Sequence, residues 1–393
     1  MRNWFKTRAA DFIEFNPRLS IKKGALATKV AMDKLQPFTK KIPATEQAEF
    51  AGGSKFCNGD TIMARITPCL ENGKTAFVDI LDDGDVAFGS TEFIVMRAKE
   101  GISDPQFVYY LATSPAFRNV AIKSMVGSSG RQRVQQGVLD ELEMLVPSLP
   151  EQQKIGAFLS LLDEKIAINN KVNDNLQQQA YAYFLQLFIE NADPSWRVGT
   201  IVDLGTVVGG GTPSKAKPEY YTDDGIAWIT PKDLSIDKSK FIAHGETDIS
   251  ELGYRNSSAT VMPTGTVLFS SRAPIGYIAI ASNEVTTNQG FKSVVPHPEI
   301  GTPFVYYFLI HNLPLIESKA SGSTFKEVSG AVMKSMEAVI PDSDTIAKFN
   351  DFCHPIFIMQ EKLEQENRKL AVMRDSLLPR LMSGEIDVSD IDF

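Results

Sequence analysis

The sequence has few of the residues that build disulfide frameworks or metal sites. Its 393 residues include three cysteines, Cys57, Cys69 and Cys353, and no two of them form a CxxC pair. Thiols so few and scattered exclude a disulfide framework and fit a reducing compartment. The four histidines show no HExxH pattern and no paired-ligand spacing, so the sequence predicts no metal site.

Long apolar runs are also absent. No stretch approaches the ~20 apolar residues that a membrane helix requires. The N-terminal sequence, MRNWFKTRAADF, lacks the apolar segment of a signal peptide. We therefore expect a cytoplasmic protein with no membrane partner.

The motifs of enzymes that act on DNA are missing as well. No GxxxxGK[ST] loop for a nucleotide-driven motor is present. An adenine methyltransferase holds its flipped base with an Asn/Asp-Pro-Pro-aromatic loop. The nearest string, residues 16–19 (NPRL), lacks the second proline and the aromatic residue. We predict no catalytic residue, and no cofactor bound by this chain.

The net charge of −8 is unevenly distributed. Residues 1–150 carry 19 basic and 17 acidic side chains, and residues 195–341 carry 12 and 14. The acid excess lies in 151–194, with 3 basic and 6 acidic residues, and in 342–393, with 6 and 11. Two nearly neutral regions can each present a basic face, so the charge pattern permits DNA binding.

A heptad pattern runs through residues 150–191. Alternating steps of four and three residues are typical of a helix that lies along another helix. The positions are Ile155, Leu159, Leu162, Ile166, Asn169, Asn173, Leu176, Ala180 and Tyr183. A second, more broken set lies 194 residues later, where Asn173 falls on Asn367. A seam asparagine fixes register at some cost in stability; the alternative is a frayed, solvated seam at these asparagines.

The remaining sequence reads as two copies with their elements in the same order. Trp4 aligns with Trp196, and residues 107–110 (FVYY) align with 304–307 (FVYY). Each copy has short β-branched and aromatic runs, including 76–80, 92–96, 267–271 and 277–281, which favour strands. The FVYY segments have a helical pattern, which favours a core position for Tyr109, Tyr110, Tyr306 and Tyr307 over stacking on a base.

We therefore predict an α+β protein with a pseudo-twofold internal repeat. Two mixed α/β domains are separated by two long helices that pair as an antiparallel coiled coil. The expected segments are domain 1–149, helix 150–191, domain 195–341, helix 342–384 and acidic tail 385–393. Helices of ~30–38 residues span roughly 45–57 Å, against ~34 Å for one turn of B-DNA. Such a layout suits the reading of one duplex at two places.

Several segments resemble a known family. They are residues 150–155 (PEQQKI), 377–386 (LLPRLMSGEI), 210–214 (GGTPS), 229–234 (ITPKDL), 58–61 (NGDT) and 88–93 (FGSTEF). These resemble recurrent segments of the specificity (S) subunits of Type I restriction-modification enzymes, across the whole chain and in the family's domain order. Residues 16–18 (NPR) stand where the first domain would carry GGTPS, so contacts cannot be copied between the domains.

The resemblance implies a non-catalytic DNA-reading subunit. Each target recognition domain would read one half of an interrupted site in double-stranded DNA. The helices would set the gap and dock two modification (methyltransferase) subunits, which bind S-adenosylmethionine. Restriction (nuclease-translocase) subunits, which use ATP and Mg, would complete the complex.

Candidate DNA contacts are polar residues on loops, because Arg, Asn and Gln read base edges and Lys, Arg and Ser hold phosphates. In the first domain they are Arg65, Asn72, Lys74, Ser128, Ser129, Gly130, Arg131, Gln132 and Arg133. In the second they are Arg272, Asn288, Gln289, Lys292, Ser321, Gly322, Ser323, Thr324 and Lys326. The loop 126–133 (VGSSGRQR) is the strongest group. Any one residue alone is also compatible with a solvated loop charge.

Two other functions remain open at this point. A duplicated coiled-coil adaptor that binds only proteins would show no preference in a random-duplex selection. An enzyme of unusual motif would show turnover as the purified chain.

Overall fold

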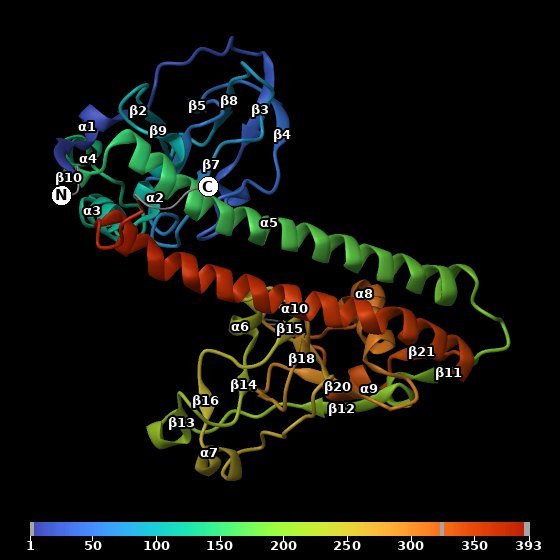
Figure 1. The fold of residues 1–393 in the computed structure, drawn as a ribbon. Helices are drawn as coiled ribbons and strands as arrows, with labels where there is room; N and C mark the ends of the chain where they lie inside the picture. The colour runs from blue at the N-terminus through green and yellow to red at the C-terminus, as the bar shows by residue number, and fades with distance from the viewer. Residues whose placement is uncertain (1–3, 323–325, 389–393) are drawn as a thin grey trace. The chain divides into compact units, whose positions relative to one another are not determined.

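The computed structural model describes residues 4–322 and 326–388, and the chain divides into two compact units. Unit 1 comprises Met1–Ile168 and Asn367–Phe393, and unit 2 comprises Asn169–Glu366. Two long helices contribute to both units (Figure 1). They are α5, Leu149–Leu185, which continues into the π-helical turn Gln186–Glu190, and α10, Ser343–Met382.

Within its described residues, unit 1 contains two four-stranded sheets and one two-stranded ribbon. The strand orders are β2-β9-β6-β7, β4-β3-β8-β5 and β1-β10. The strands are β1 Phe5–Arg8, β2 Ile13–Phe15, β3 Leu26–Val30, β4 Glu46–Glu49, β5 Ser54–Phe56, β6 Thr61–Ala64, β7 Thr75–Phe77, β8 Ala87–Gly89, β9 Phe93–Ala98 and β10 Glu143–Val146. The helices are α1 Ala9–Phe12, α2 Pro105–Thr113, α3 Pro115–Lys123 and α4 Gln136–Asp140. All strand pairs are antiparallel except β3 with β8.

The described part of unit 2 is built around one five-stranded sheet, β12-β20-β17-β18-β15, with three short two-stranded pairs. Its strands are β11 Arg197–Thr200, β12 Gly205–Gly209, β13 Tyr221–Thr222, β14 Trp228–Ile229, β15 Phe241–Ile242, β16 Asp248–Ile249, β17 Val267–Ser271, β18 Ile275–Ala281, β19 Thr286–Thr287, β20 Lys292–Pro296 and β21 Glu337–Ile340. Its helices are α6 Pro231–Ile236, α7 Glu251–Arg255, α8 Thr302–Ser318 and α9 Gly330–Lys334. The sheet lies beside the first half of α10 (Figure 1).

The predicted helices over the two FVYY segments are confirmed as parts of α2 and α8. Proline in the first turn starts both helices, and in α2 the Asp104 side chain also accepts a hydrogen bond from the Phe107 N–H at 2.9 Å. All four tyrosines are buried, as predicted. The strand expected at 76–80 is shorter, because β7 ends at Phe77 and the Val78 N–H bonds the Asp60 carbonyl outside any ladder.

The two aligned tryptophans make the same contact in each unit. The Trp4 indole N–H donates to the Glu151 carboxylate at 3.1 Å, and that of Trp196 donates to Asp342 at 2.9 Å. Each carboxylate lies at the start of the long helix that follows its own domain. The repeat seen in the sequence therefore extends to individual hydrogen bonds.

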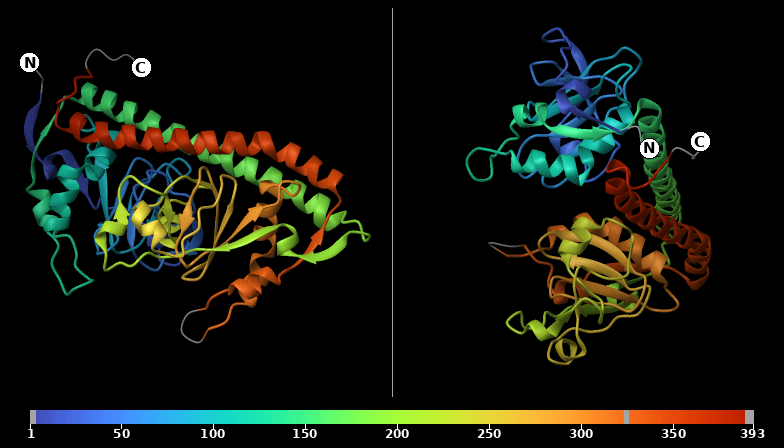
Figure 2. Two further views of the ribbon diagram at one scale, coloured as in Figure 1. Left: turned by 90° about the horizontal axis from the view of Figure 1, so that it is seen from below. Right: turned by 60° about the vertical axis from the view of Figure 1, so that its left-hand side comes forward.

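Segments of α5 and α10 contact each other within each unit, and Figure 2 shows them side by side. In unit 2, the Asn169 side chain donates to Glu366 at 2.9 Å, and Gln360 donates to the Asn173 carbonyl at 3.2 Å. Asn169 is 1% exposed, which argues against a frayed, solvated seam at this position. In unit 1, Arg374 donates to Asp163 at 2.6 Å, and both side chains are largely buried.

We expect the substitution Arg374→Leu to lower the free energy of unfolding by about 3–5 kcal/mol, because it leaves the buried Asp163 carboxylate without its cation. Urea denaturation of the full chain measures this. The control is Arg255→Leu on α7, where the ion pair with Glu251 is exposed on both sides and contributes little. Equal stability of the two variants would show that the Arg374 pair has no special role.

Candidate nucleic-acid interface

In unit 1, the predicted contact residues Arg65 and Arg133 lie close together at the end of β6. Arg65 directly follows this strand, and its N–H and carbonyl bond the backbone of Glu92 and Val134, each at 2.9 Å. Two residues later, the Thr67 N–H bonds the Gln132 carbonyl at 3.0 Å, and the Thr67 hydroxyl accepts from the Gln132 N–H at 3.1 Å. The loop 126–133 is thus tied to the end of β6, and Arg65 lies beside Val134, the residue that follows this loop.

The loop 126–133 is a narrow hairpin that projects from the domain. Val126 and Arg133 exchange two backbone hydrogen bonds at its base, at 3.1 and 2.9 Å. Gly127 has φ +137°, and a Cβ there would lie 3.0 Å from the Arg131 carbonyl oxygen, so this position requires glycine. Residues 128–131 are exposed, which leaves their hydroxyl, backbone and guanidinium groups accessible to a phosphate.

Arg133 already has an acidic partner. Its guanidinium donates to both carboxylate oxygens of Glu92, with the shortest distance 2.6 Å. This hydrogen bonding raises the pKa of the arginine above its ordinary value. Because Arg133 remains about half exposed, the fork can exchange this carboxylate for a phosphate or a base edge.

Asn72 and Lys74 lie farther along the turn between β6 and β7. Asn72 is exposed. The Lys74 ammonium donates to the Met32 carbonyl at 2.9 Å, so the domain itself uses one of its three donors. Contact of these two residues with DNA stays a prediction.

Unit 2 has the same arrangement at the end of β17. Arg272 follows this strand and forms a β-bridge with Glu327, which also bridges Ser321. The Val328 N–H bonds the Ser271 carbonyl at 3.0 Å. The stretch that aligns with 126–133 is therefore tied to the equivalent strand. Ser321, Gly322 and Lys326 are exposed, while the predicted contacts Ser323 and Thr324 lie outside the described residues.

One carboxylate links two of the predicted cations in unit 2. Glu327 lies 3.4 Å from the Arg272 guanidinium and 3.5 Å from the Lys292 ammonium. The nearby loop holds Asn288, whose side-chain oxygen accepts from the Gly290 N–H at 2.8 Å, and Gln289, which is exposed. The predicted residues of this domain thus gather on neighbouring strand ends.

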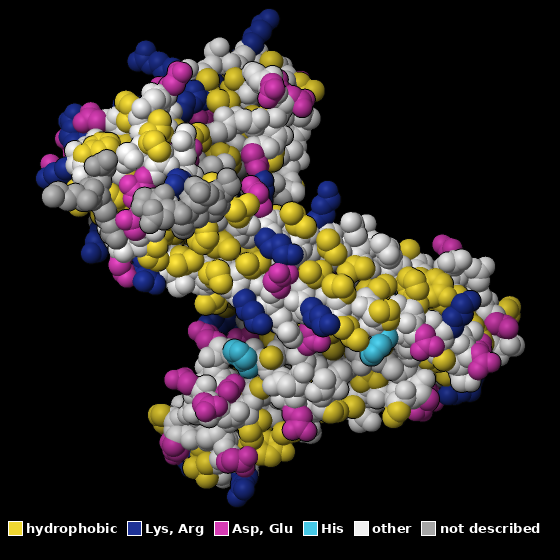
Figure 3. Space-filling view, in the orientation of Figure 1, with side chains coloured by type: hydrophobic (Ala, Val, Ile, Leu, Met, Phe, Trp, Pro, Cys, Tyr) yellow, Lys and Arg dark blue, Asp and Glu magenta, His cyan; other side chains and the backbone are white. Residues whose placement is uncertain are grey.

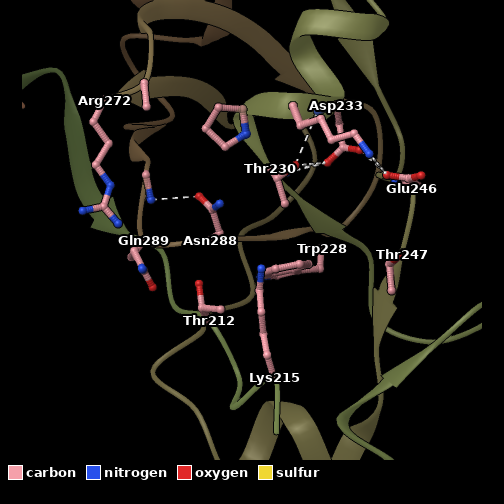
Figure 4. Close-up of a pocket in the computed structure, with 14 residues that line it drawn as sticks. Thr212, Lys215, Trp228, Thr230, Asp233, Glu246, Thr247, Arg272, Asn288 and Gln289 are labelled. Atoms are coloured by element: carbon pink, nitrogen blue, oxygen red, sulfur yellow. Dashed lines mark hydrogen bonds and ion pairs between the residues drawn. The ribbon is translucent and has the colours of Figure 1, made fainter. Parts of the chain in front are cut away.

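A cavity of about 510 Å³ lies at this place. Figure 4 shows the side chains that line it, many of them polar or charged. Clefts of ~300–1,000 Å³ commonly hold ligand-sized groups, so a base edge or a sugar-phosphate fits the space. The cavity brings Arg272, Asn288 and Gln289, which the sequence predicted, together with Thr212, Lys215, Trp228, Thr230 and Lys232, which it did not.

Local hydrogen bonds hold this unpredicted wall in place. The Trp228 indole donates to the Gly211 carbonyl at 3.0 Å, and Asp233 accepts from both the N–H and the hydroxyl of Thr230, forming the cap of α6. The exposed Lys232 ammonium pairs with Glu246 at 2.5 Å, which raises the lysine pKa above its ordinary value. The GGTPS and ITPKDL segments were the signal for this wall, since both were recognised in the sequence but not as contact sites.

The described residues were also compared with the requirements of metal sites and membrane-spanning helices. Residues 4–322 and 326–388 contain no group of three or more His, Cys, Asp or Glu side chains placed to hold a metal ion. No helix in the same ranges is long and apolar enough to span a bilayer.

The sequence is similar to those of known proteins. A sequence profile described as the Type I restriction modification DNA specificity domain matches residues 17–178 and 194–366. The chain is 39% identical over 163 residues to the Type I restriction enzyme MjaIX specificity subunit of Methanocaldococcus jannaschii, covering 41% of this chain and 38% of that protein. It is 25% identical to the Type I restriction enzyme HindI specificity subunit of Haemophilus influenzae, over 84% of this chain and 86% of that protein.

A solved structure shares the fold. The crystal structure of the Type-I restriction-modification S subunit from M. genitalium has a TM-score of 0.57 at 16% identity, covering 97% of this chain and 96% of that chain. Because the two profile matches together span most of the sequence, the chain belongs to the Type I restriction-modification DNA specificity family, whose members recognise DNA sequence and are not catalytic.

Proposed function

We propose that this chain reads an interrupted site in double-stranded DNA, with domain 1–149 on one half-site and domain 195–341 on the other. One observation carries the proposal: in each unit an arginine directly follows a central strand, and a polar segment is tied to that strand end. Arg65 lies beside 126–133 in unit 1, and Arg272 lies beside 320–327 in unit 2. Arg, Gln and Asn at such places suit base edges, and Ser, Lys and backbone N–H groups suit phosphates.

The two sites differ in their side chains, which suits an asymmetric target. The first hairpin presents Arg131, Gln132 and Arg133, whereas the second domain offers the cavity with Gln289 and Arg272. Different donor and acceptor patterns select different bases in the major groove. An adaptor that binds only proteins gives no reason for polar, hydrogen-bonding residues to gather at both strand ends.

The long helices are proposed to act as the spacer. In this proposal, segments 150–191 and 342–384 form one antiparallel coiled coil with a pseudo-twofold axis, and its length sets the gap between half-sites. The polar contacts of Asn169 and Gln360 support a single register, since each has its partner at one alignment of the helices.

Exposed apolar side chains on the helices suit protein partners. Figure 3 shows hydrophobic side chains over the long helices. The exposed large apolar residues of the two helices are Leu161, Ile168, Val372 and Met373 in unit 1, and Val172, Phe352, Ile358 and Met359 in unit 2. Apolar groups at this density mark interaction surfaces.

We propose that two modification subunits cover these surfaces and bind S-adenosylmethionine. Restriction subunits that use ATP and Mg then join the complex in the cytoplasm. In this arrangement the present chain contributes the sequence reading and the scaffold.

We expect the substitution Gln289→Ala to relax recognition at one base pair of one half-site, by about 1–3 kcal/mol, because a bidentate amide contact is lost. The other half-site should stay unchanged. Selection from a random-duplex library by the assembled complex measures both effects at once. Lys348→Ala, an exposed substitution on α10, is the control and should leave both half-sites as they are. Equal loss at both half-sites would contradict the assignment of Gln289 to one domain's readout.

We expect that inserting one heptad into both long helices lengthens the gap and leaves the half-sites unchanged. Seven residues add about 10 Å of helix, which corresponds to about three base pairs. Mapping of methylated adenines in cells that carry the complex measures the gap. Exchanging exposed residues within one heptad, without a change in length, is the control. An unchanged gap after insertion would exclude the helices as the spacer.

A further inference from the structure

A lysine is buried between the first domain and the long helices. Lys40 is 4% exposed, and its ammonium donates to the Ser160 hydroxyl on α5 at 2.7 Å. It also lies 3.4 Å from the Tyr110 hydroxyl on α2 and over three aromatic rings, those of Phe77, Tyr109 and Tyr110, at 5.1–5.7 Å. Its donors are therefore directed at the helix and its charge at the aromatic core of the domain.

The contact continues to the second long helix. The Tyr110 hydroxyl donates to Asp163 on α5 at 2.6 Å, and the other oxygen of Asp163 accepts from Arg374 on α10 at 2.6 Å. One buried polar chain thus joins a loop of the domain, α2, α5 and α10 within unit 1.

Unit 2 holds a second lysine in the same role. Lys240 is 8% exposed, and its ammonium donates to Gln177 on α5 at 3.0 Å and to Gln360 on α10 at 2.9 Å. It lies 3.5 Å from the Phe357 ring centre and 4.4 Å from that of Tyr306. The backbone N–H of Lys240 also donates to Glu364 at 2.8 Å.

The two lysines occupy equivalent positions. The Lys40 carbonyl accepts from the Phe77 N–H on β7, and the Lys240 carbonyl accepts from the Ile280 N–H on β18. Each ammonium lies against the tyrosine pair of its own FVYY segment. The helix residues that receive the ammonium differ, so the lysine is repeated although its partners are not.

Burial of an ammonium group costs free energy, because the charge loses its hydration. Burial lowers the pKa of Lys40 to about 8 and lowers that of Lys240 well below its ordinary value. Replacement of the lysine by an apolar side chain of similar volume would leave the free energy of unfolding unchanged or increase it. However, an apolar contact tolerates small slides and rotations, whereas an ammonium is satisfied only where its particular acceptors converge.

We propose that Lys40 and Lys240 are positioning residues that hold each recognition domain on the long helices in one orientation, and so restrict the gap between half-sites to one length. This inference rests on the proposed reading of an interrupted site. It concerns the spacing of the half-sites and not the bases within them.

The test compares Lys40→Met and Lys240→Met with two neighbouring controls, Lys41→Met and Lys238→Met. Lys41 forms a partly exposed ion pair with Asp79, and Lys238 is exposed. Each variant is assembled with its modification subunits and used to select from a random-duplex library, which reports half-site bases and gap lengths together. Thermal unfolding is measured in parallel.

We expect both buried-lysine variants to keep the half-site bases and to be as stable as the wild type or more so. Their preference for one gap over gaps one base pair longer or shorter should fall about tenfold, the equivalent of one charged hydrogen bond of about 1.4 kcal/mol. Both controls should keep a single gap. Higher stability with poorer spacing is a combination that a merely structural lysine would not produce.

A pH series tests the same proposal on the wild-type protein, so the result does not depend on the folding of a variant. The charged and titratable groups facing Lys40 are Asp163 and Glu164 of α5, Arg374 of α10, Tyr109 and Tyr110 of α2, and Lys41, Asp79 and Asp104 of the domain. Between pH 8 and the unfolded lysine pKa of about 10.4, the unfolded chain binds more protons than the folded one, so stability rises with pH. In the same range the wild type loses the Lys40 ammonium, and its gap preference should broaden toward that of Lys40→Met.

The outcomes separate the two proposals. A wild type that selects no interrupted site would overturn the proposed function. A wild type with one gap at pH 7 and at pH 9, or folded methionine variants that keep a single gap, would overturn the positioning role while leaving the proposed function intact.

Discussion

The structure depends on a core that is shared between the globular region and the long helices in each unit, beside a second buried cluster in each globular region that contains no residue of α5 or α10. In unit 1, Ile155 and Leu159 of α5 and Leu378 and Leu381 of α10 belong to the same buried cluster as Phe107 of α2. In unit 2, Phe184 of α5 and Phe349 of α10 are buried together with Phe304 and Tyr307 of α8. Removal of either helix would expose this apolar surface, so each domain and its helix segments form one folding unit.

Polar groups inside that core fix the alignment of the helix segments. Apolar burial alone is nearly indifferent to small rotations, whereas the Arg374–Asp163 pair and the Asn169–Glu366 hydrogen bond are each satisfied at one alignment. Such contacts cost stability, which a large core can supply. Apolar burial therefore supplies the stability of each unit, and the buried polar contacts select one alignment of its helix segments.

The proposed DNA-contact residues lie on loops and strand ends at the edge of the core. Arg65 and Arg272 directly follow the buried strands β6 and β17, and the residues 128–131 beside Arg65 are exposed. Rigid strand ends position the side chains, while exposed loops can vary without disturbing the core. The same scaffold therefore carries Arg-Gln-Arg in one domain and a polar cavity in the other.

Periodicity and repetition were readable from the sequence alone. The heptad spacing predicted both long helices, and the two FVYY segments predicted α2 and α8, because a local pattern of apolar residues depends only on neighbours along the chain. The alignment of 126–133 with 320–327 identified the two candidate contact segments, and the hydrogen-bonding capacity of arginine selected Arg65 and Arg272. The sequence did not predict the cavity wall formed by Lys215, Trp228 and Lys232. It also did not predict the burial of Lys40 and Lys240, because the contacts of these side chains join residues far apart in the sequence. Lys40 meets Ser160 across 120 positions, and Lys240 meets Gln360 across another 120. Only the folded chain brings these groups together, since burial of a charge is decided by what surrounds it in space.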